Sequence, residues 1–91
     1  MSNGSDSRSV HSLVADGCLI EGEVENSIIS RGVIIEKGAR VCDSVLMQGA
    51  VVRSGASLAY VIADKNVTIN QDRMLMGHLT YPLAIAKESV V

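Results

Sequence analysis

The chain has 91 residues, two tyrosines as its only aromatic residues, and a formal net charge of −2. This length allows one small domain, and the near-neutral charge without a basic run argues against a nucleic-acid or anionic-membrane surface. No apolar run approaches the roughly twenty residues of a membrane span, and no signal-peptide core occurs near the N-terminus. We therefore expect a cytoplasmic protein that binds neither nucleic acid nor membrane.

The N-terminal segment, residues 1–9, differs in composition from the rest of the chain. It is rich in Ser, Asn, Asp and Gly and contains no aliphatic residue apart from the initial Met. A segment of this composition cannot bury enough apolar surface to fold. We predict that residues 1–9 are a disordered leader, either part of an expression tag or the end of a linker.

Aliphatic residues recur every five or six positions from residue 10 to residue 76. From Leu46 to Leu75 the intervals are six, six, five, six and six residues, so one turn of three intervals takes seventeen residues. Short repeats of this kind indicate a solenoid, in which each unit buries its apolar face only against its neighbours. We predict an all-β fold, a left-handed parallel β-helix of hexapeptide repeats with seventeen-residue coils. The predicted inward-facing anchors are Val14, Ile20, Val24, Ile29, Ile35, Val41, Leu46, Val52, Leu58, Ala63, Ile69 and Leu75.

Two further sets of residues support this register. Gly, Asn or Asp recurs at two corners of the predicted triangular coil, where the chain needs the left-handed backbone that these residues adopt most readily. The first corner carries Gly17, Gly32, Gly49 and Asn66, and the second carries Gly38, Gly55 and Asp72. The fourth residue after each anchor is also predicted to face inward. These residues are Cys18, Ile28, Val33, Ala39, Val45, Ala50, Ala56, Ile62 and Val67, with Arg73 as the charged exception.

An apolar row is predicted on the outside of the solenoid. Leu19, Ile34 and Val51 occupy the last position of successive hexads, which points outward, and Thr68 continues the row. An aligned apolar strip is unlike scattered surface hydrophobic residues and indicates a docking surface. We predict that Leu19, Ile34 and Val51 form an interface. The alternative is that the leader or the C-terminal tail folds over them.

The repeat is predicted to end near Leu75, and residues 77–91 are predicted to cap it. An open end of stacked parallel coils exposes unpaired backbone groups and invites end-to-end association. Residues 81–85 are apolar enough to lie across that end, with Pro82 fixing the turn that brings them back. Residues 90–91 can then pair as a last strand. The alternative is that the repeat stops and the tail frays.

The reactive side chains do not form a catalytic or metal-binding pattern. His11 and His78 lie at the two ends of the repeat, whereas hexapeptide acyltransferases use a histidine base in a groove between subunits. A β-helical carbonic anhydrase needs three histidines on its metal. Cys18 is predicted to point inward and Cys42 outward, so no disulfide joins them. We expect no catalytic residue, no metal site and no cofactor in this chain.

Three segments resemble bacterial glucose-1-phosphate adenylyltransferase (ADP-glucose pyrophosphorylase). In residues 12–33, the runs Val-Ala-Asp-Gly-Cys and Val-Glu-Asn-Ser-Ile-Ile-Ser-Arg-Gly are similar to the opening β-helix coils of that family. Residues 62–69, Ile-Ala-Asp-Lys-Asn-Val-Thr-Ile, resemble a later coil. The tail, residues 76–87, is similar to the non-catalytic, regulatory-type subunit found in Gram-positive glycogen operons.

The resemblance implies a role in glycogen synthesis, where glucose-1-phosphate and ATP give ADP-glucose and pyrophosphate. In that family an N-terminal nucleotide-binding domain with a Gly-rich loop carries the chemistry, and this chain contains no such loop. The resemblance therefore implies a C-terminal β-helix domain that serves oligomer assembly and allosteric regulation and is not catalytic alone. Its partners would be that missing domain and further subunits of the same or another kind. The alternatives are a pure assembly module without an effector site, and a fragment of a hexapeptide acyltransferase.

The resemblance also implies one effector-binding residue, Lys87. In relatives, a lysine after an aliphatic strand near the C-terminus holds an anionic sugar-phosphate or phosphoglycerate effector. Lys87 follows Ile85 and Ala86 in a similar setting. This sequence departs from the family where Glu88 replaces a more often neutral residue. The alternative is a solvated lysine on a terminal strand.

Overall fold

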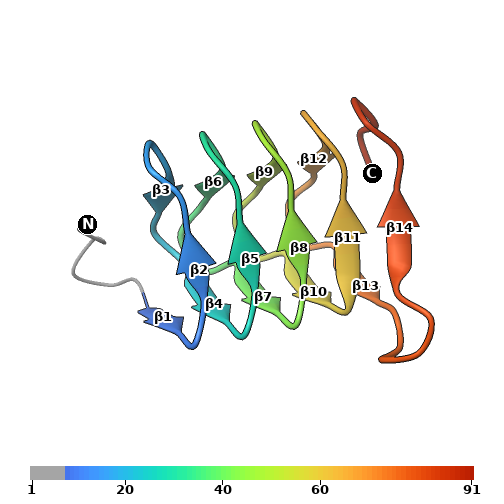
Figure 1. Cartoon of the computed structure of the whole chain (residues 1–91). Coiled ribbons are helices and arrows are strands. Elements are labelled where there is room, and N and C mark those ends of the chain that lie inside the picture. The colour runs from blue at the N-terminus through green and yellow to red at the C-terminus, as the bar shows by residue number, and fades with distance from the viewer. Residues whose placement is uncertain (1–7) are drawn as a thin grey trace.

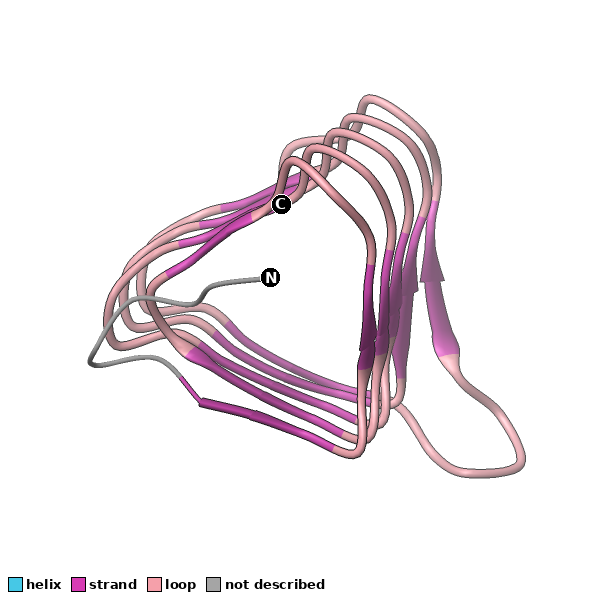
Figure 2. Cartoon of the chain, turned by 60° about the vertical axis from the view of Figure 1, so that its left-hand side comes forward, coloured by secondary structure: helices cyan, strands magenta, loops and turns pink. Residues whose placement is uncertain are grey.

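The computed structural model describes residues 8–91, which form a three-sided β-helix of short parallel strands (Figure 1). Viewed along its axis, the solenoid has a triangular cross-section (Figure 2). Sheet A contains β1 (Arg8–Val10), β4 (Glu23–Glu25), β7 (Arg40–Cys42), β10 (Ser57–Ala59) and β13 (Met74–Met76). Sheet B contains β2 (Leu13–Val14), β5 (Ile28–Ile29), β8 (Val45–Leu46), β11 (Val61–Ala63) and β14 (Leu83–Ile85). Sheet C contains β3 (Leu19–Ile20), β6 (Ile34–Ile35), β9 (Val51–Val52) and β12 (Thr68–Ile69).

This architecture confirms the predicted left-handed parallel β-helix of hexapeptide repeats. In the regular coils each residue pairs with the residue seventeen positions on, as Ile35 does with Val52 and Val52 with Ile69. Among the described residues no helix has the length and apolarity needed to cross a membrane.

The first coil is two residues shorter than the others, as its spacing predicts. On all three sheets its residues pair fifteen positions on, as Ser9 does with Val24 and Ile20 with Ile35. From Val24 on, in contrast, residues pair seventeen positions on, as Val24 does with Val41. The shortening therefore lies at the corner between Ile20 and Val24, where Gly22 is buried. Gly22 is suited to this position because a Cβ there would overlap the carbonyl oxygen of Ala39.

The interior is a column of the predicted anchors. All anchors from Ile20 to Ile69 are at most 3% exposed, and Val14 and Leu75 pack against this core at its two ends. The side chains are aliphatic because strands only about 4.8 Å apart stack equivalent residues directly on one another. The sequence prediction of the core is confirmed for this set.

The second predicted inward set is wrong on sheet B. Ile28 is 48% exposed, and Val45 and Ile62 are half-buried, with their side chains on the outer face. On this sheet the interval before the anchor is five residues, so the fourth residue after one anchor directly precedes the next. Side chains alternate along a strand, and a residue next to an inward anchor must therefore point outward. The inward positions, two residues before the anchors, are those of Ser27, Ser44 and Val61.

A ladder of serine hydroxyls joins the coils at the start of sheet B. Ser12 Oγ accepts the backbone N–H of Ser27 at 3.0 Å, and Ser27 Oγ accepts that of Ser44 at 3.0 Å. Ser44 Oγ in turn accepts the N–H of Val61 at 3.1 Å and donates to the Cys42 carbonyl at 2.7 Å. These bonds satisfy polar groups that burial would otherwise leave unpaired.

The left-handed corners include one that the sequence analysis missed. Gly32 and Asn66 (φ 70° and 56°) and Gly38 and Asp72 (φ 83° and 58°) confirm the two predicted corners. The third corner, between sheets A and B, carries His11, Asn26, Asp43 and Tyr60, with φ of 48° to 55°. Asn26 Nδ2 donates to Asp43 Oδ1 at 2.6 Å along this corner. Asn26 and Asp43, seventeen positions apart, carry a sequence signal for this corner, whereas His11 and Tyr60 at its two ends carry none.

The C-terminal segment continues the solenoid and does not lie across its end. Strand β14 pairs in parallel with β11, with Ala63 opposite Ile85, twenty-two positions on. The additional residues form a loop between β13 and β14, in which His78 and Tyr81 form an antiparallel bridge. Val90 then bridges to Thr68, which confirms the predicted last pairing. Edge pairing satisfies the backbone of the last coil in a way that a crossing segment could not.

The predicted leader lies mostly outside the described residues. Residues 1–7 are not described, whereas Arg8 and Ser9, which were assigned to the leader, belong to β1. They pair in parallel with Glu23 and Val24 of β4. The first strand therefore begins two residues before the predicted start of the β-helix at residue 10.

Candidate functional site

The predicted apolar row runs along sheet C and is called here the sheet C strip, consisting of Leu19, Ile34, Val51 and Thr68. Parallel pairing puts these four residues in one register. Leu19 is 53% exposed and the other three are half-buried. The described C-terminal tail does not fold over the strip, because Val90 extends the row by pairing beside Thr68.

A second apolar row, the sheet B strip, consists of Leu13, Ile28, Val45, Ile62 and Ala84. Successive members are paired in register across all five coils of sheet B. Beside them on the same face lies a second outward row, which consists of Ala15, Ser30, Met47, Asp64 and Ala86. This surface is not predicted from the sequence, because Ile28, Val45 and Ile62 occupy positions that the spacing assigns to the interior.

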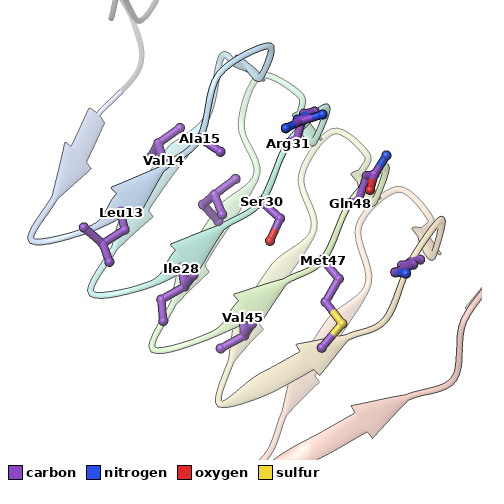
Figure 3. A pocket seen from close by; sticks show the side chains of 11 residues that line it. Leu13, Val14, Ala15, Ile28, Ser30, Arg31, Val45, Met47 and Gln48 are labelled. Atoms are coloured by element: carbon purple, nitrogen blue, oxygen red, sulfur yellow. The ribbon is translucent and has the colours of Figure 1, made fainter.

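An open groove of about 800 Å³ lies over the sheet B strip. Leu13, Ile28 and Val45 line its floor in a row, and Met47 stands beside Val45 (Figure 3). Arg31, Gln48 and Lys65 line the groove as well. The arrangement can bind an apolar surface and place anionic groups of a partner against one side.

The polar side of the groove is a stack of residues at the corner between sheets B and C, called here the basic corner. It consists of Arg31, Gln48, Lys65 and Lys87, each two residues after an inward-facing residue of sheet B. Backbone hydrogen bonds hold the stack together: Asn66 N donates to Gln48 O at 2.9 Å and Glu88 N to Lys65 O at 2.8 Å. Arg31, Lys65 and Lys87 are all exposed. Neighbouring members are therefore about one strand spacing apart, roughly 4.8 Å along the axis.

The proposed effector residue Lys87 is thus the last member of this stack. It is exposed, and no ion pair joins it to another residue within 8–91. Glu88 takes the left-handed corner position, with φ of 63°, that glycine or asparagine occupies in earlier coils. Stacking places Lys87 next to Lys65, which the sequence analysis did not connect with it. Two adjacent cationic side chains can together contact one anionic group.

The remaining reactive groups are dispersed. Within residues 8–91 no three His, Cys, Asp or Glu side chains come together as a metal site would require. The Cys18 thiol donates to the carbonyl oxygen of Ser30 at 3.0 Å, and both cysteines are free, as predicted. Partial burial raises the pKa of the Cys42 thiol, and the nearby Glu25 carboxylate raises it further. Cys42 is therefore held in its protonated, less nucleophilic form at neutral pH.

Comparison with known proteins gives one family and a set of relatives. A family model described as "GlmU-like, C-terminal hexapeptide" matches residues 1–78. The glucose-1-phosphate adenylyltransferase of Clostridioides difficile is 41% identical over 61 residues, which are 67% of this chain and 16% of that enzyme. The enzyme of the same name from Corynebacterium jeikeium is 38% identical over 65 residues, 70% of this chain and 16% of the enzyme. That from Bacillus cytotoxicus is 34% identical over 64 residues, 70% of this chain and 17% of the enzyme.

The similarity covers a domain-sized part of these enzymes. The chain spans only 16 to 17% of the length of these curated relatives. No solved structure matches the chain significantly. The comparisons therefore identify a hexapeptide-repeat domain homologous to part of glucose-1-phosphate adenylyltransferases.

Proposed function

The chain belongs to the family of GlmU-like C-terminal hexapeptide domains, and from this we propose that it acts as the C-terminal β-helix domain of a glucose-1-phosphate adenylyltransferase subunit. The observation that carries the proposal is its 34 to 41% identity to three enzymes of that name. In this proposal a nucleotidyltransferase domain converts ATP and glucose-1-phosphate to ADP-glucose in the cytoplasm. The β-helix contributes subunit assembly and allosteric regulation, and has no activity alone.

The regulatory part of the proposal rests on the basic corner. An anionic sugar-phosphate or phosphoglycerate would be held at Lys87, with Lys65 of the preceding coil beside it. Both lysines are exposed and form no ion pair with another described residue. Clustered cations of this kind attract phosphate groups, and the attraction is stronger at low ionic strength.

A domain graft tests the proposed function. Residues 8–91 replace the C-terminal hexapeptide-repeat portion of the Clostridioides difficile enzyme, and ADP-glucose formation is measured with and without a sugar bisphosphate or phosphoglycerate. We expect the chimera to assemble, to form ADP-glucose and to respond to the anion. Lys87→Gln should reduce the response about tenfold or more, since a charge-assisted contact contributes about 1.5–3 kcal/mol, and should leave the basal rate unchanged.

Arg40→Gln on sheet A is the matched control for the graft, because it removes an exposed cation outside the basic corner. A chimera that assembles and catalyses but ignores both anions would support the pure assembly module. A folded chimera that makes no ADP-glucose would contradict the proposed function.

The assembly part of the proposal rests on the sheet C strip, and Ile34→Glu with Val51→Glu is expected to weaken it. Two carboxylates in adjacent coils remove the apolar contact and repel each other. The mass measured by light scattering should fall, while circular dichroism keeps the strand signal because both side chains point outward. Ser57→Glu with Ala59→Glu adds the same charge to the outer face of sheet A and should leave the mass unchanged. An unchanged mass in the first variant would show that the strip is not an interface.

A further inference from the structure

We propose that the outer face of sheet B binds the same face of a second copy of this chain, with the two solenoids antiparallel and related by a two-fold axis. The axis is parallel to the strands of sheet B and passes over β8, the middle strand of the sheet. The proposal concerns the chain itself and does not depend on which enzyme it belongs to. It arises from a self-complementary arrangement of apolar, charged and protruding groups on this one face.

The apolar rows match themselves under this symmetry. With five coils in sheet B, a two-fold axis at β8 places the first coil on the fifth and the second on the fourth. Within the sheet B strip, Ile28 then lies against Ile62 of the second copy, and Val45 against Val45. In the neighbouring row, Met47 meets Met47 of the second copy. A two-fold interface must be self-complementary in this way.

The alternative parallel arrangement fits less well. A two-fold axis parallel to the solenoid axis would place the sheet B strip of one copy against the second outward row of the other copy. Ile62 would then lie against Asp64 of the second copy, so an unpaired carboxylate would be buried on an apolar side chain. Burial of an unpaired charge is unfavourable, and the antiparallel arrangement avoids it.

The antiparallel arrangement gives the acidic side chains of this face cationic neighbours on the second copy. Asp64 is the one acidic residue in the two outward rows of sheet B, and symmetry places it against Ser30 of the second copy, next to Arg31. At the ends of the same edge, Asp16 comes near Lys87 of the second copy. Arg31 also approaches Lys65 of the second copy at the basic corner, a like-charge contact that the neighbouring Asp64 carboxylate of the second copy offsets.

The loop between β13 and β14 also contributes to the proposed interface. It projects from the corner between sheets A and B (Figure 2), and its Leu79 and Tyr81 are 77% and 82% exposed. The two-fold axis places this corner of the fifth coil next to the first coil of the second copy. There Leu13, which is 71% exposed, lies at the edge of the strip. Each copy would therefore cover the exposed apolar end of the other.

The available area is sufficient for such a dimer. A specific interface buries about 800 Å² on each partner. The chain exposes 5491 Å² in total, so the interface would take about a seventh of it. One of the three faces of a short prism, extended by the loop, can supply that share.

The first test measures the dimer by sedimentation equilibrium. We expect the Ile34→Glu, Val51→Glu chain, which lacks the sheet C contact, to form a dimer, and at least about hundredfold weaker dimerisation when Val45→Glu is added, because the symmetry brings the two glutamates face to face. Ser57→Glu, on sheet A, is the control and should not change the affinity. Circular dichroism establishes that each variant is folded. If the Ile34→Glu, Val51→Glu chain is monomeric at about 100 μM, or if it still dimerises normally when folded with Val45→Glu added, the proposal is overturned.

The second test fixes the orientation by charge reversal. Asp64→Arg should weaken the dimer about tenfold, because it adds a third cation beside Arg31 and Lys65 of the second copy, and the further change Arg31→Asp should return the affinity to within about threefold of the starting chain. In one chain these residues lie two coils apart, so restoration reports contact between copies. A double variant that dimerises no better than Asp64→Arg alone would overturn the antiparallel arrangement. ADP-glucose formation by the graft can fail without affecting either result, so the two proposals are tested separately.

Discussion

Val52→Asp is expected to abolish cooperative unfolding and most of the strand signal in circular dichroism. Val52 is 0% exposed and lies in sheet C between Ile35 and Ile69 of the adjacent coils, which are buried equally. No described polar side chain in this column could pair with the carboxylate. Burial of an unpaired charge costs several kcal/mol, a large share of the roughly 5–15 kcal/mol that stabilises a domain.

The adjacent residue provides the control for this prediction. Val51→Asp introduces the same side chain one position earlier, where the alternation of β9 directs it outward. It should unfold cooperatively with a loss of no more than about 1 kcal/mol, as is usual for surface substitutions. A well-folded Val52→Asp protein, or equal losses in the two variants, would show that the register of sheet C is wrong.

Truncation after Gly77 is expected to cause aggregation or loss of solubility. It removes β14, whose Ile85 is 9% exposed and packs on the end of the core. It also removes acceptors for backbone N–H groups of the last full coil: Asp64 N donates to Ile85 O at 3.1 Å and Thr68 N to Ser89 O at 2.9 Å. The strands β11 and β12 would become unpaired edges, and exposed edges are templates for association. Size-exclusion chromatography and thermal unfolding measure the effect.

Two substitutions in the full-length chain separate packing from simple shortening. Ile85→Asp should lower the unfolding temperature, because this side chain faces the core. Ala84→Asp, on the exposed side of the same strand, should not. A truncated protein that stays monodisperse and equally stable would show that the C-terminal segment does not protect the solenoid.

The sequence alone determined the repeat, the anchors of the core and two of the three corners. These features depend on one-dimensional spacing: the recurrence of aliphatic residues such as Leu46 and Ala63 every seventeen positions and the glycines at left-handed turns. In a solenoid each coil contacts only its neighbours. The repeat interval in the sequence therefore gives directly which residues of adjacent coils are in contact. The same spacing predicted the sheet C strip.

Only the tertiary structure decided which side chains of sheet B face outward and how the last strand pairs, because these depend on the shape of the corners and on the closure of the last coil. The interval on sheet B is five residues, and only the folded coil shows that this turns Ile28 and Val45 outward and Ser44 inward. The pairing of Ile85 with Ala63, twenty-two positions back, bypasses a loop that no repeat encodes. That pairing places Lys87 beside Lys65 and completes the face of sheet B. Residues brought together by a long-range strand pairing cannot be found from local periodicity, because the offset is set by the backbone hydrogen bonds of the folded coil.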